Sequence, residues 1–492
     1  MTPAVWGLVR AGAAVLAGVG LTYAAVQVPW TTSLSPETTA AAAAAATPTT
    51  APVATNVLIC PGPESEGLQG VPAVGGTTTV LAASPPAQVM QGIDVSGTSG
   101  TLTVTADPAQ TAVGSTEERG RVVQGPLSGA SVGQVVGAGA LAAGLSGLQT
   151  TVTTEGDDRA AVATACQAPR PELWLVAGGG GSTRRERVVL TNPGANTVSA
   201  DVTVLGSSGT LPSANGQNVS IPPRGRTSLL VDALVGPEST PVVHVVASGG
   251  VITGVVVDSW IDGATGRGAD DAAPAAEPAN EQVVPAAYLD GPARLRVAVP
   301  GTEETVVQAR ALTKDGPVAL RDEGVLRVPG GTVRELDLSS VAAGAYAIQV
   351  RADHPVVAGV MAERRPKRAG QSDFGWTAST APIGAVAGTP LPASATASVM
   401  LVATGDTATA TIYVVSESGT VDVRPFSLGA DSVVTSDVSG ARQVWVRPSA
   451  GTVRAGLSLS LAPANAEPLF ALVPLPPAVV SATQVPVRQI PG

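Results

Sequence analysis

Three segments of this 492-residue chain end in the same pattern, and this internal repeat constrains the fold more than any other feature. The copies lie at residues 241–257, 346–361 and 443–459. Each contains two runs in which apolar and polar residues alternate around a short turn, which is the pattern of a β-hairpin. A chain that repeats such a unit is expected to build a tandem series of β modules.

A comparable front half precedes each hairpin. These front halves lie at residues 187–206, 304–316 and 396–419. In the clearest copy, Asn192-Pro193-Gly194 supplies turn residues between two strands. Four strands with one or two short ones make a module of about 80 to 100 residues. We interpret residues 57–166 as a fourth, more divergent copy whose closing hairpin is 148–165.

The composition agrees with an all-β fold. Val and Thr cluster in short runs, the chain contains 57 Gly and 41 Pro, and only 13% of its residues are charged. Such spacing of strand and turn residues is typical of β-sandwiches. We therefore predict tandem immunoglobulin-like β-sandwich modules. Their expected limits are 57–170, 171–285, 286–390 and 391–492, the last with a Pro-rich tail.

Residues 1–30 are predicted to form a membrane anchor. Their apolar core, residues 11–28, is close to the ~17 to 25 apolar residues that a bilayer-spanning helix needs. Arg10 precedes this core and no Lys or Arg follows it closely, so the N-terminus is expected to be cytoplasmic and the rest of the chain extracytoplasmic. A cleaved signal peptide is the alternative, because the small residues at 22–24 and 40–46 offer cleavage sites.

Residues 31–56 are predicted to be a disordered tether. They are Thr, Ala, Pro and Ser with almost no charge, and such a segment buries too little apolar surface to fold. At about 3.1 Å per residue an extended tether would reach roughly 80 Å from the membrane. Its Ala run could instead form a short helix. A spacer of this kind suits a protein that works in or across a cell wall.

The two cysteines are expected to form one disulfide. Cys60 and Cys166 are the only cysteines, and pairing is the simplest state for two cysteines in an exported chain. In the fourth copy this bond would join the first strand to the last. Two buried thiols are the alternative.

The net charge of −10 and the pI near 4.8 argue against a nucleic-acid partner. Proteins that bind nucleic acid carry a basic patch to neutralise phosphates. The membrane, an envelope protein or a wall glycan are therefore the partners to consider.

Two long segments with few strand signals, residues 258–287 and 363–392, are predicted to be the functional loops. Each carries a Trp and several charges. The candidate interaction residues are Trp260, Asp262, Asp270, Asp271, Arg364, Arg365, Phe374 and Trp376. The alternative is that each Trp closes the end of a sandwich core and that the charges form solvated faces.

No motif predicts catalysis. Residues 129–133 match the Gly-x-Ser-x-Gly elbow of serine hydrolases, but they lie in a Gly/Ala/Val run where a chance match is expected. His244 and His354 are the only histidines, and the other repeat copies hold other residues at both positions. We expect His244 to be a strand residue and His354 to be a turn residue.

Metal and phosphate sites are also poorly supported. The separated histidines and cysteines lack the spacing of a zinc site. Asp258, Asp262, Asp270 and Asp271 could supply oxygen ligands to calcium, but they lack the spacing of an EF-hand. The glycines at 178–181 are not followed by the Lys and Ser/Thr of a phosphate-binding loop. No catalytic residue, metal or cofactor is predicted.

The order of these features resembles a known family. After the anchor, tether and Cys60 come Leu-Trp-Leu-Val-Ala-Gly-Gly-Gly-Gly at 173–181, Leu-Thr-Asn-Pro-Gly at 190–194 and Asp-Phe-Gly-Trp-Thr-Ala-Ser-Thr at 373–380. This arrangement is similar to an actinobacterial domain-of-unknown-function family, numbered 5719, over nearly all of the chain after the tether. The resemblance implies a membrane-anchored envelope protein with no assigned activity, so it transfers no catalytic residue.

We therefore expect a non-catalytic scaffold or accessory protein of the cell envelope. A wall-glycan binder that uses Trp260 and Trp376 as sugar platforms is the alternative. Six Trp, four Tyr and three Phe leave few aromatic side chains for such platforms. An envelope hydrolase is the third possibility and would need a cleft that holds His244 with a Ser and a carboxylate.

Overall fold

The computed structural model describes residues 49–63, 76–154, 156, 159–364, 372–461 and 469–484. The chain divides into a small unit, Met1–Ala51 with Thr483–Gly492, and a large unit, Pro52–Ala482. In the described part, β1 (Thr49–Pro52) pairs with β35 (Ser481–Gln484). The only α-helix among the described residues is α2 (Val231–Val235), so the predicted all-β class is confirmed.

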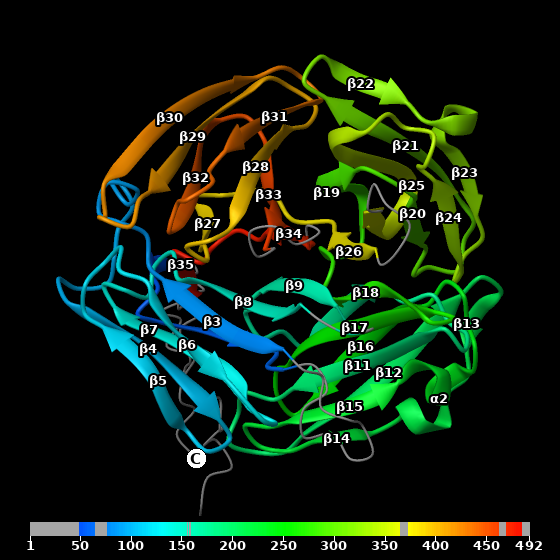
Figure 1. Ribbon diagram of the computed structural model, residues 1–492, viewed down its shortest axis with the longest axis horizontal. Coiled ribbons are helices and arrows are strands. Elements are labelled where there is room, and N and C mark those ends of the chain that lie inside the picture. Colours follow the sequence, from blue (N-terminus) through cyan, green and yellow to red (C-terminus); the bar gives the residue numbers. More distant parts are fainter. Residues whose placement is uncertain are drawn as a thin grey trace, which may run out of the picture. The chain divides into compact units, whose positions relative to one another are not determined.

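The large unit contains four modules, each built from two antiparallel sheets (Figure 1). Module 1 comprises the sheets β2 (Thr55–Cys60), β7 (Val132–Gly139), β4 (Gly100–Asp107), β5 (Thr111–Thr116) and β6 (Val123–Leu127), β3 (Thr77–Ala83), β8 (Ser146–Thr153), β9 (Ala160–Ala165). Module 2 comprises β10 (Glu172–Val176), β16 (Val242–Ser248), β12 (Val198–Gly206), β13 (Gly209–Leu211) with β14 (Val219–Ile221), and β15 (Arg226–Leu230), β11 (Arg184–Thr191), β17 (Thr253–Asp262), β18 (Thr265–Ala272).

Modules 3 and 4 follow the same order. Module 3 comprises β19 (Ala279–Leu289), β25 (Gly344–Arg364), β21 (Thr305–Thr313), β22 (Gly316–Ala319) with β23 (Val325–Val328), and β24 (Val333–Asp337), β20 (Ala293–Ala298), β25, β26 (Asp373–Ala378). Module 4 comprises β27 (Ala387–Pro390), β32 (Gln443–Ala450), β29 (Ala408–Val415), β30 (Val421–Leu428), and β31 (Ser432–Asp437), β28 (Thr396–Ala403), β33 (Val453–Ser460), β34 (Phe470–Leu475). In modules 1 and 4 the first strand lies beside the sixth, in modules 2 and 3 it lies beside the seventh, and in every module the last strand lies at a sheet edge. The predicted repeat is therefore confirmed, and β19 spans the expected module limit at residue 285.

The predicted closing hairpins are wrong. In module 2, β16 and β17 follow each other in sequence but belong to different sheets, and β32 and β33 do the same in module 4. In module 3 a single strand, β25, runs through both sheets. Alternation predicts which face of a strand is buried but not which strand pairs with it, so the repeat could not distinguish these cases.

In module 1 the hairpin predicted at residues 148–165 lies one strand later than the segment that corresponds to the other copies. Residues 148–165 form β8 and β9, which do pair as neighbours. The strands of module 1 that correspond to the repeat are β7 and β8, and these lie in different sheets.

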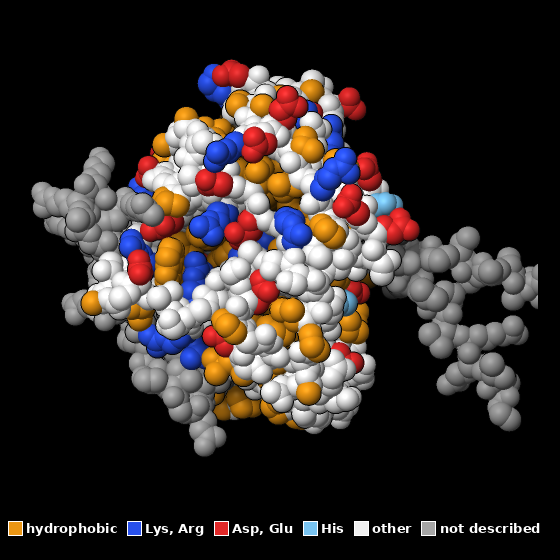
Figure 2. Space-filling view, turned by 90° about the vertical axis from the view of Figure 1, so that its right-hand side faces the viewer, with side chains coloured by type: hydrophobic (Ala, Val, Ile, Leu, Met, Phe, Trp, Pro, Cys, Tyr) orange, Lys and Arg blue, Asp and Glu red, His pale blue; other side chains and the backbone are white. Residues whose placement is uncertain are grey.

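Each module buries one core between its two sheets. In module 4, for example, Ile412 and Val446 from one sheet share a cluster with Leu401 and Leu457 from the other. Cationic and anionic side chains lie next to one another on the face shown in Figure 2. The apolar faces of the strands thus turn to the core, and side chains of both charges lie among other side chains on this outer face.

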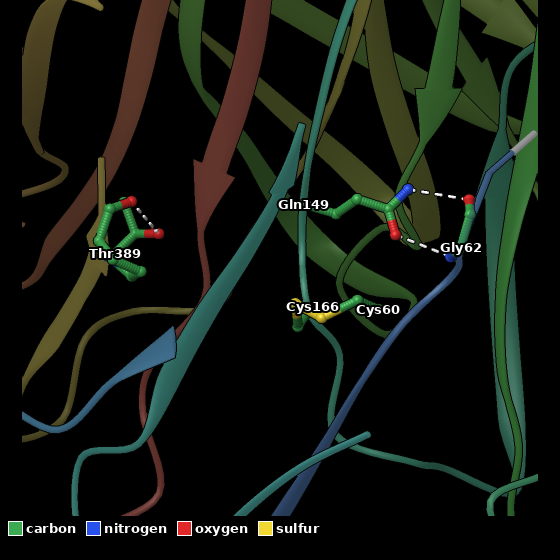
Figure 3. The surroundings of a disulfide bond; sticks show 6 residues. Cys60, Gly62, Gln149, Cys166 and Thr389 are labelled. Atoms are coloured by element: carbon green, nitrogen blue, oxygen red, sulfur yellow. Dashed lines mark hydrogen bonds between the residues drawn. A yellow bond between two sulfur atoms is a disulfide. The ribbon is translucent and has the colours of Figure 1, made fainter. Parts of the chain in front are cut away.

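The predicted disulfide is confirmed. Cys60, the last residue of β2, is bonded to Cys166, which directly follows β9 (Figure 3). Beside the bond, the side chain of Gln149 accepts a hydrogen bond from the Gly62 amide at 2.7 Å and donates one to the Gly62 carbonyl at 2.9 Å. All four groups are buried, so these contacts bind the end of β2 to the opposite sheet.

The predicted anchor at residues 1–30 lies outside the described residues. Among the residues that are described, no helix is long and apolar enough to cross a membrane. The predicted tether needs correction at its end, because Thr49–Pro52 and Thr55–Cys60 are strands. Pairing with β35 and burial of Val53 supply the order that the local composition did not predict.

Replacing both Cys60 and Cys166 by Ser is expected to lower the free energy of unfolding. The bond closes a sequence separation of 106 residues, which corresponds to about 4 to 5 kcal/mol in the chain-entropy model. Urea unfolding of the variant and of the reduced wild type should give the same lowered midpoint. An unchanged midpoint, together with gel mobility that does not respond to reductant, would contradict the bond.

Candidate functional site

The four strands that end the modules meet one another. β9 contacts β18, β18 contacts β26, β26 contacts β34, and β34 contacts β9, so the contacts form a closed circuit (Figure 1). Every residue of β9, β26 and β34 is buried. We call β9, β18, β26 and β34 the inner strands, and they contain four of the eight candidate residues from the sequence: Asp270, Asp271, Phe374 and Trp376.

The two predicted functional loops are therefore wrong as loops. Residues 258–287 contain the end of β17, all of β18 and most of β19, and residues 363–392 contain β26 and β27. The inner strands face other modules on the side where an ordinary surface strand faces water. They consequently carry Gly, Ala, Asp and aromatic residues instead of the alternation that identifies a strand in the sequence.

Side chains of the inner strands fill the core of the neighbouring module. Phe374 and Trp376 of β26 belong to the core cluster of module 2, and Phe470 of β34 belongs to that of module 3. Ala163 and Ala165 of β9 belong to the core cluster of module 4. Three of the four modules thus have a core that a neighbour completes.

Asp373 joins three modules through its carboxylate. Its Oδ2 accepts hydrogen bonds from the amides of Ala161 in module 1, at 3.3 Å, and Phe470 in module 4, at 3.0 Å. Its Oδ1 accepts one from the amide of Phe374 at 3.0 Å. The side chain is 1% exposed, and this burial raises the pKa of Asp373 well above its usual value.

Trp376 is held by two buried carboxylates of module 2. Its amide donates to Asp270 Oδ2 at 2.6 Å and its indole nitrogen donates to Asp258 Oδ2 at 2.8 Å. Burial raises the pKa of Asp270 well above its usual value. Asp258 also accepts a hydrogen bond from the guanidinium of Arg184. These contacts fix β26 against β17 and β18.

We call the region where β26 packs against β17 and β18 the junction. The Arg184 guanidinium lies there between aromatic rings. It is 4.5 Å from the ring centroid of Trp260 and 5.1 Å from that of Phe374, and the two rings meet edge to face at 6.1 Å. Cation–π contacts of this kind stabilise by about 0.5 to 2 kcal/mol. Trp260 is therefore half-buried by Arg184 and Phe374.

The glycine-rich loop at residues 178–181 binds the side chain of Glu186, a residue of β11. Its Oε1 accepts hydrogen bonds from the amides of Gly179 and Gly180, while Oε2 is buried with no hydrogen-bond partner among the described residues. Burial, and then the nearby Asp258 carboxylate, raise the pKa of Glu186 to about 7. The glycine amides therefore bind a carboxylate of the same chain.

The remaining candidates divide between the junction and the surface. Asp271 is buried on β18, and its carbonyl accepts a hydrogen bond from the Thr164 hydroxyl at 3.0 Å. Asp262 is exposed and pairs with Arg267 at 2.9 Å. Arg364, at the end of β25, lies 3.6 Å from Asp290. Arg365 lies outside the described residues.

Sequence reasoning missed four residues of this junction: Arg184, Glu186, Asp258 as a partner of Trp376, and Asp373. Asp258 and Asp373 are each a charge in a strand whose other nearby residues are apolar or small. That signal could have found these two residues, because a charge is rarely buried unless it is paired. Arg184 and Glu186 lie in a run of charged residues, 184–187, where this signal is absent.

The structure offers no assembled metal site in its described ranges. No group of three or more His, Cys, Asp or Glu residues there could hold an ion. Of the four aspartates considered for calcium, Asp258 binds Arg184 and Trp376, and Asp270 binds the Trp376 amide. At least one oxygen of each of these two carboxylates is thus bound within the protein itself.

The motifs considered for catalysis lie in ordinary structure. Residues 129–133 run through the turn between β6 and β7, so the segment is followed by a strand and not by the helix of a hydrolase elbow. The His244 ring stacks on Trp174 at 3.9 Å, and its Nε2 lies 2.8 Å from Glu172. His354 lies 3.4 Å from Glu303 and, contrary to the expected turn, belongs to β25.

A family of unknown function (DUF5719) matches residues 121–439 of the chain. No curated protein matches the chain. Among solved structures, the chain is 16% identical to Thermotoga maritima 1070, with 21% of this chain and 95% of that chain covered and a TM-score of 0.18. It is 12% identical to a tetra-tandem repeat in the extending region of a large adhesion protein, with 81% and 98% covered and a TM-score of 0.10.

Replacing Asp373 by Ala should destabilise the large unit by about 3 kcal/mol or more. The substitution leaves three buried amides without an acceptor, and each unsatisfied group costs about 1 to 3 kcal/mol. Urea unfolding measures the loss, and Asp353→Ala, at an exposed position of module 3, is the matched control. Equal stability of the two variants would show that Asp373 does not join the modules.

Glu186→Gln should change how stability depends on pH. The pKa of Glu186 is about 7 in the folded chain and near 4.5 when unfolded, so the folded wild type binds more protons between these values. Its stability therefore falls, by about 3 kcal/mol for this group, as pH rises from about 4.5 to 7. The glutamine cannot ionise, so the free energy of unfolding of the variant should not fall in this way. Near pH 7 the variant should therefore gain about 3 kcal/mol relative to the wild type. Parallel pH profiles would contradict the prediction, and Glu304→Gln, at an exposed ion pair, is the control.

Proposed function

The chain belongs to this family of unknown function, and we propose that it is a non-catalytic scaffold or accessory protein of a cell envelope. Residues 1–30 would anchor it in the membrane, with the modules on the extracytoplasmic side. We further propose that each pair of facing sheets is an immunoglobulin-like sandwich. The antiparallel strand order shared by the four modules supports this proposal.

The observation that carries the scaffold proposal is the exchange of core side chains between modules. Phe374, Trp376 and Phe470 each complete the core of a module other than their own. Separate apolar clusters join modules 2 and 3, 3 and 4, and 1 and 4. Modules joined by apolar cores move little against one another. A rigid body of this kind suits a platform that holds partners at fixed positions.

The polar groups of the junction are used internally, which favours a scaffold over an enzyme. Asp258, Asp270 and Asp373 accept hydrogen bonds from Trp, Arg and backbone groups. A catalytic carboxylate needs a face open to substrate, and these side chains are at most 2% exposed. The disulfide of Cys60 and Cys166 suits an oxidising, extracytoplasmic compartment.

The glycan alternative does not gain support from the tryptophans. Trp376 is 3% exposed and Trp445 is fully buried, so neither offers a face to a sugar. Trp174 is stacked on His244, and Trp260 is half-buried beneath Arg184. Partner contacts are therefore better sought on the outer strands.

Exposed apolar side chains on module 3 mark one such surface. Val318 on β22 is 47% exposed and Val325 on β23 is 43% exposed, and both strands pair with β21. Both strands lie at the edge of this sheet, and an apolar side chain exposed at such an edge is a position that a partner strand can cover.

Photo-crosslinking in the native envelope tests the scaffold proposal. A benzophenone amino acid at Val318 should capture a defined envelope protein, which mass spectrometry identifies. The same group at Asp353, an exposed polar position on β25 of the same module, is the control for contacts by proximity alone. Recovery of wall polysaccharide without a protein partner would favour the glycan binder. A soluble mature chain that begins beyond Ala24 would contradict the anchor.

A further inference from the structure

A mostly apolar cavity of about 140 Å³ lies where the four inner strands end. The residues that directly follow β9, β18, β26 and β34 all line it: Cys166, Ala273, Ser379 and Pro476. The chain segments that leave the inner strands therefore bound this cavity together. A molecule bound there would contact all four of them.

Apolar side chains form most of the cavity wall. They are leucines, alanines, prolines and a valine, among them Leu58 of β2. Two of the polar side chains in the wall are already bonded within the protein. The Ser146 hydroxyl donates to the Gly388 carbonyl at 2.6 Å, and the Gln167 side chain accepts a hydrogen bond from the Gly254 amide at 3.2 Å. A ligand that is apolar where it meets this wall leaves water and gains dispersion contacts.

The size of the cavity suits a short apolar chain. An apolar cavity of about 150 Å³ holds a molecule of the size of benzene, so about six carbon atoms fit here. A second cavity, of about 350 Å³, shares Arg170 and Pro274 with the first. Glu277, Glu281 and Arg454 line this second cavity, which gives the apolar cavity a polar entrance.

Arg170 is the one charged residue, within the described ranges, that lines the apolar cavity, and it also lines the entrance. Its side chain is exposed and forms no ion pair with a described residue. The nearby Glu172 carboxylate instead accepts a hydrogen bond from the Trp174 indole at 3.1 Å and lies 2.8 Å from His244. A guanidinium binds a carboxylate through two parallel hydrogen bonds, and one arginine balances its single negative charge.

The segment after β34 forms one wall of the cavity and connects modules 4 and 1. The Ala478 amide donates to the Val386 carbonyl at 2.9 Å, and the Gly144 amide donates to the Val479 carbonyl at 2.9 Å. A ligand that packs against this wall should slow the opening of the segment. Hydrogen exchange of residues 476–480 is therefore a local measure of binding.

We propose that this cavity binds an acyl chain of about six carbons that ends in a carboxylate. The chain fills the apolar cavity, and the carboxylate meets Arg170 where the polar entrance begins. This proposal is independent of the scaffold proposal, because none of the residues that carry it belongs to the exposed edge of module 3.

Titration of the full-length protein in a maltoside detergent tests the site with four probes: heptanoate, butanoate, heptanol and heptylamine. Calorimetry measures affinity, and hydrogen exchange of residues 476–480 reports where the probe binds. Heptanoate should bind saturably and slow this exchange. Butanoate should bind about fiftyfold more weakly, since each buried CH₂ strengthens binding about fourfold. Heptanol should bind severalfold more weakly than heptanoate, and heptylamine more weakly still.

Each probe can contradict one part of the proposal. Butanoate that binds as tightly as heptanoate would overturn the apolar chain. Heptanol or heptylamine that binds as tightly as heptanoate would overturn the carboxylate. Heptanoate that does not bind, or that binds without slowing exchange at residues 476–480, would overturn the site.

Variants separate the two halves of the site. Ala273→Phe fills the apolar cavity and should weaken heptanoate and heptanol alike, by about tenfold or more, while urea unfolding checks its fold. Arg170→Gln changes an exposed side chain and should weaken heptanoate severalfold without affecting heptanol. Arg327→Gln removes an exposed arginine from module 3 and should leave both affinities unchanged. Equal effects of Arg170→Gln and Arg327→Gln on heptanoate would overturn the role of Arg170.

Discussion

The packing of inner-strand side chains into neighbouring modules is the interaction on which the rest of the structure depends. A module of about 100 residues closes its own core only in part, and an open sheet edge exposes unpaired backbone groups. Here β26 and β34 cover such an opening in the preceding module with Phe374, Trp376 and Phe470. The same contacts bury the inner strands, and this burial raises the pKa values of their aspartates Asp270 and Asp373.

That environment explains the carboxylates at the centre. Asp270 and Asp373 accept hydrogen bonds from backbone amides of other modules. Each carboxylate therefore connects two or more modules through contacts that an apolar side chain could not make. The raised pKa values of Asp270 and Asp373 reflect the electrostatic cost of burying these two carboxylates. Arg184, in contact with Asp258 and two aromatic rings, lowers this cost at the boundary of modules 2 and 3. The specificity of module docking thus comes from polar groups, and its strength comes from apolar ones.

Sequence reasoning predicted the all-β class, the repeat, the disulfide of Cys60 with Cys166 and the family, because each depends on local spacing or composition. It wrongly predicted that β16 and β17 pair as a hairpin, since alternation is the same whether two strands share a sheet or lie in facing sheets. It assigned β18 and β26 to loops, because their Gly, Ala and Asp residues reflect contact with another module. It grouped Trp260, Asp270 and Trp376 as candidates, and the structure brings these three residues together, but as parts of a junction.

The most direct measurement is hydrogen exchange, by mass spectrometry, of the inner strands across a denaturant series. If the modules complete one another's cores, β9, β18, β26 and β34 should lose protection together at a single denaturant concentration. Separate transitions, with β9 and the rest of module 1 exchanging while β26 and β34 remain protected, would contradict the interlocked arrangement.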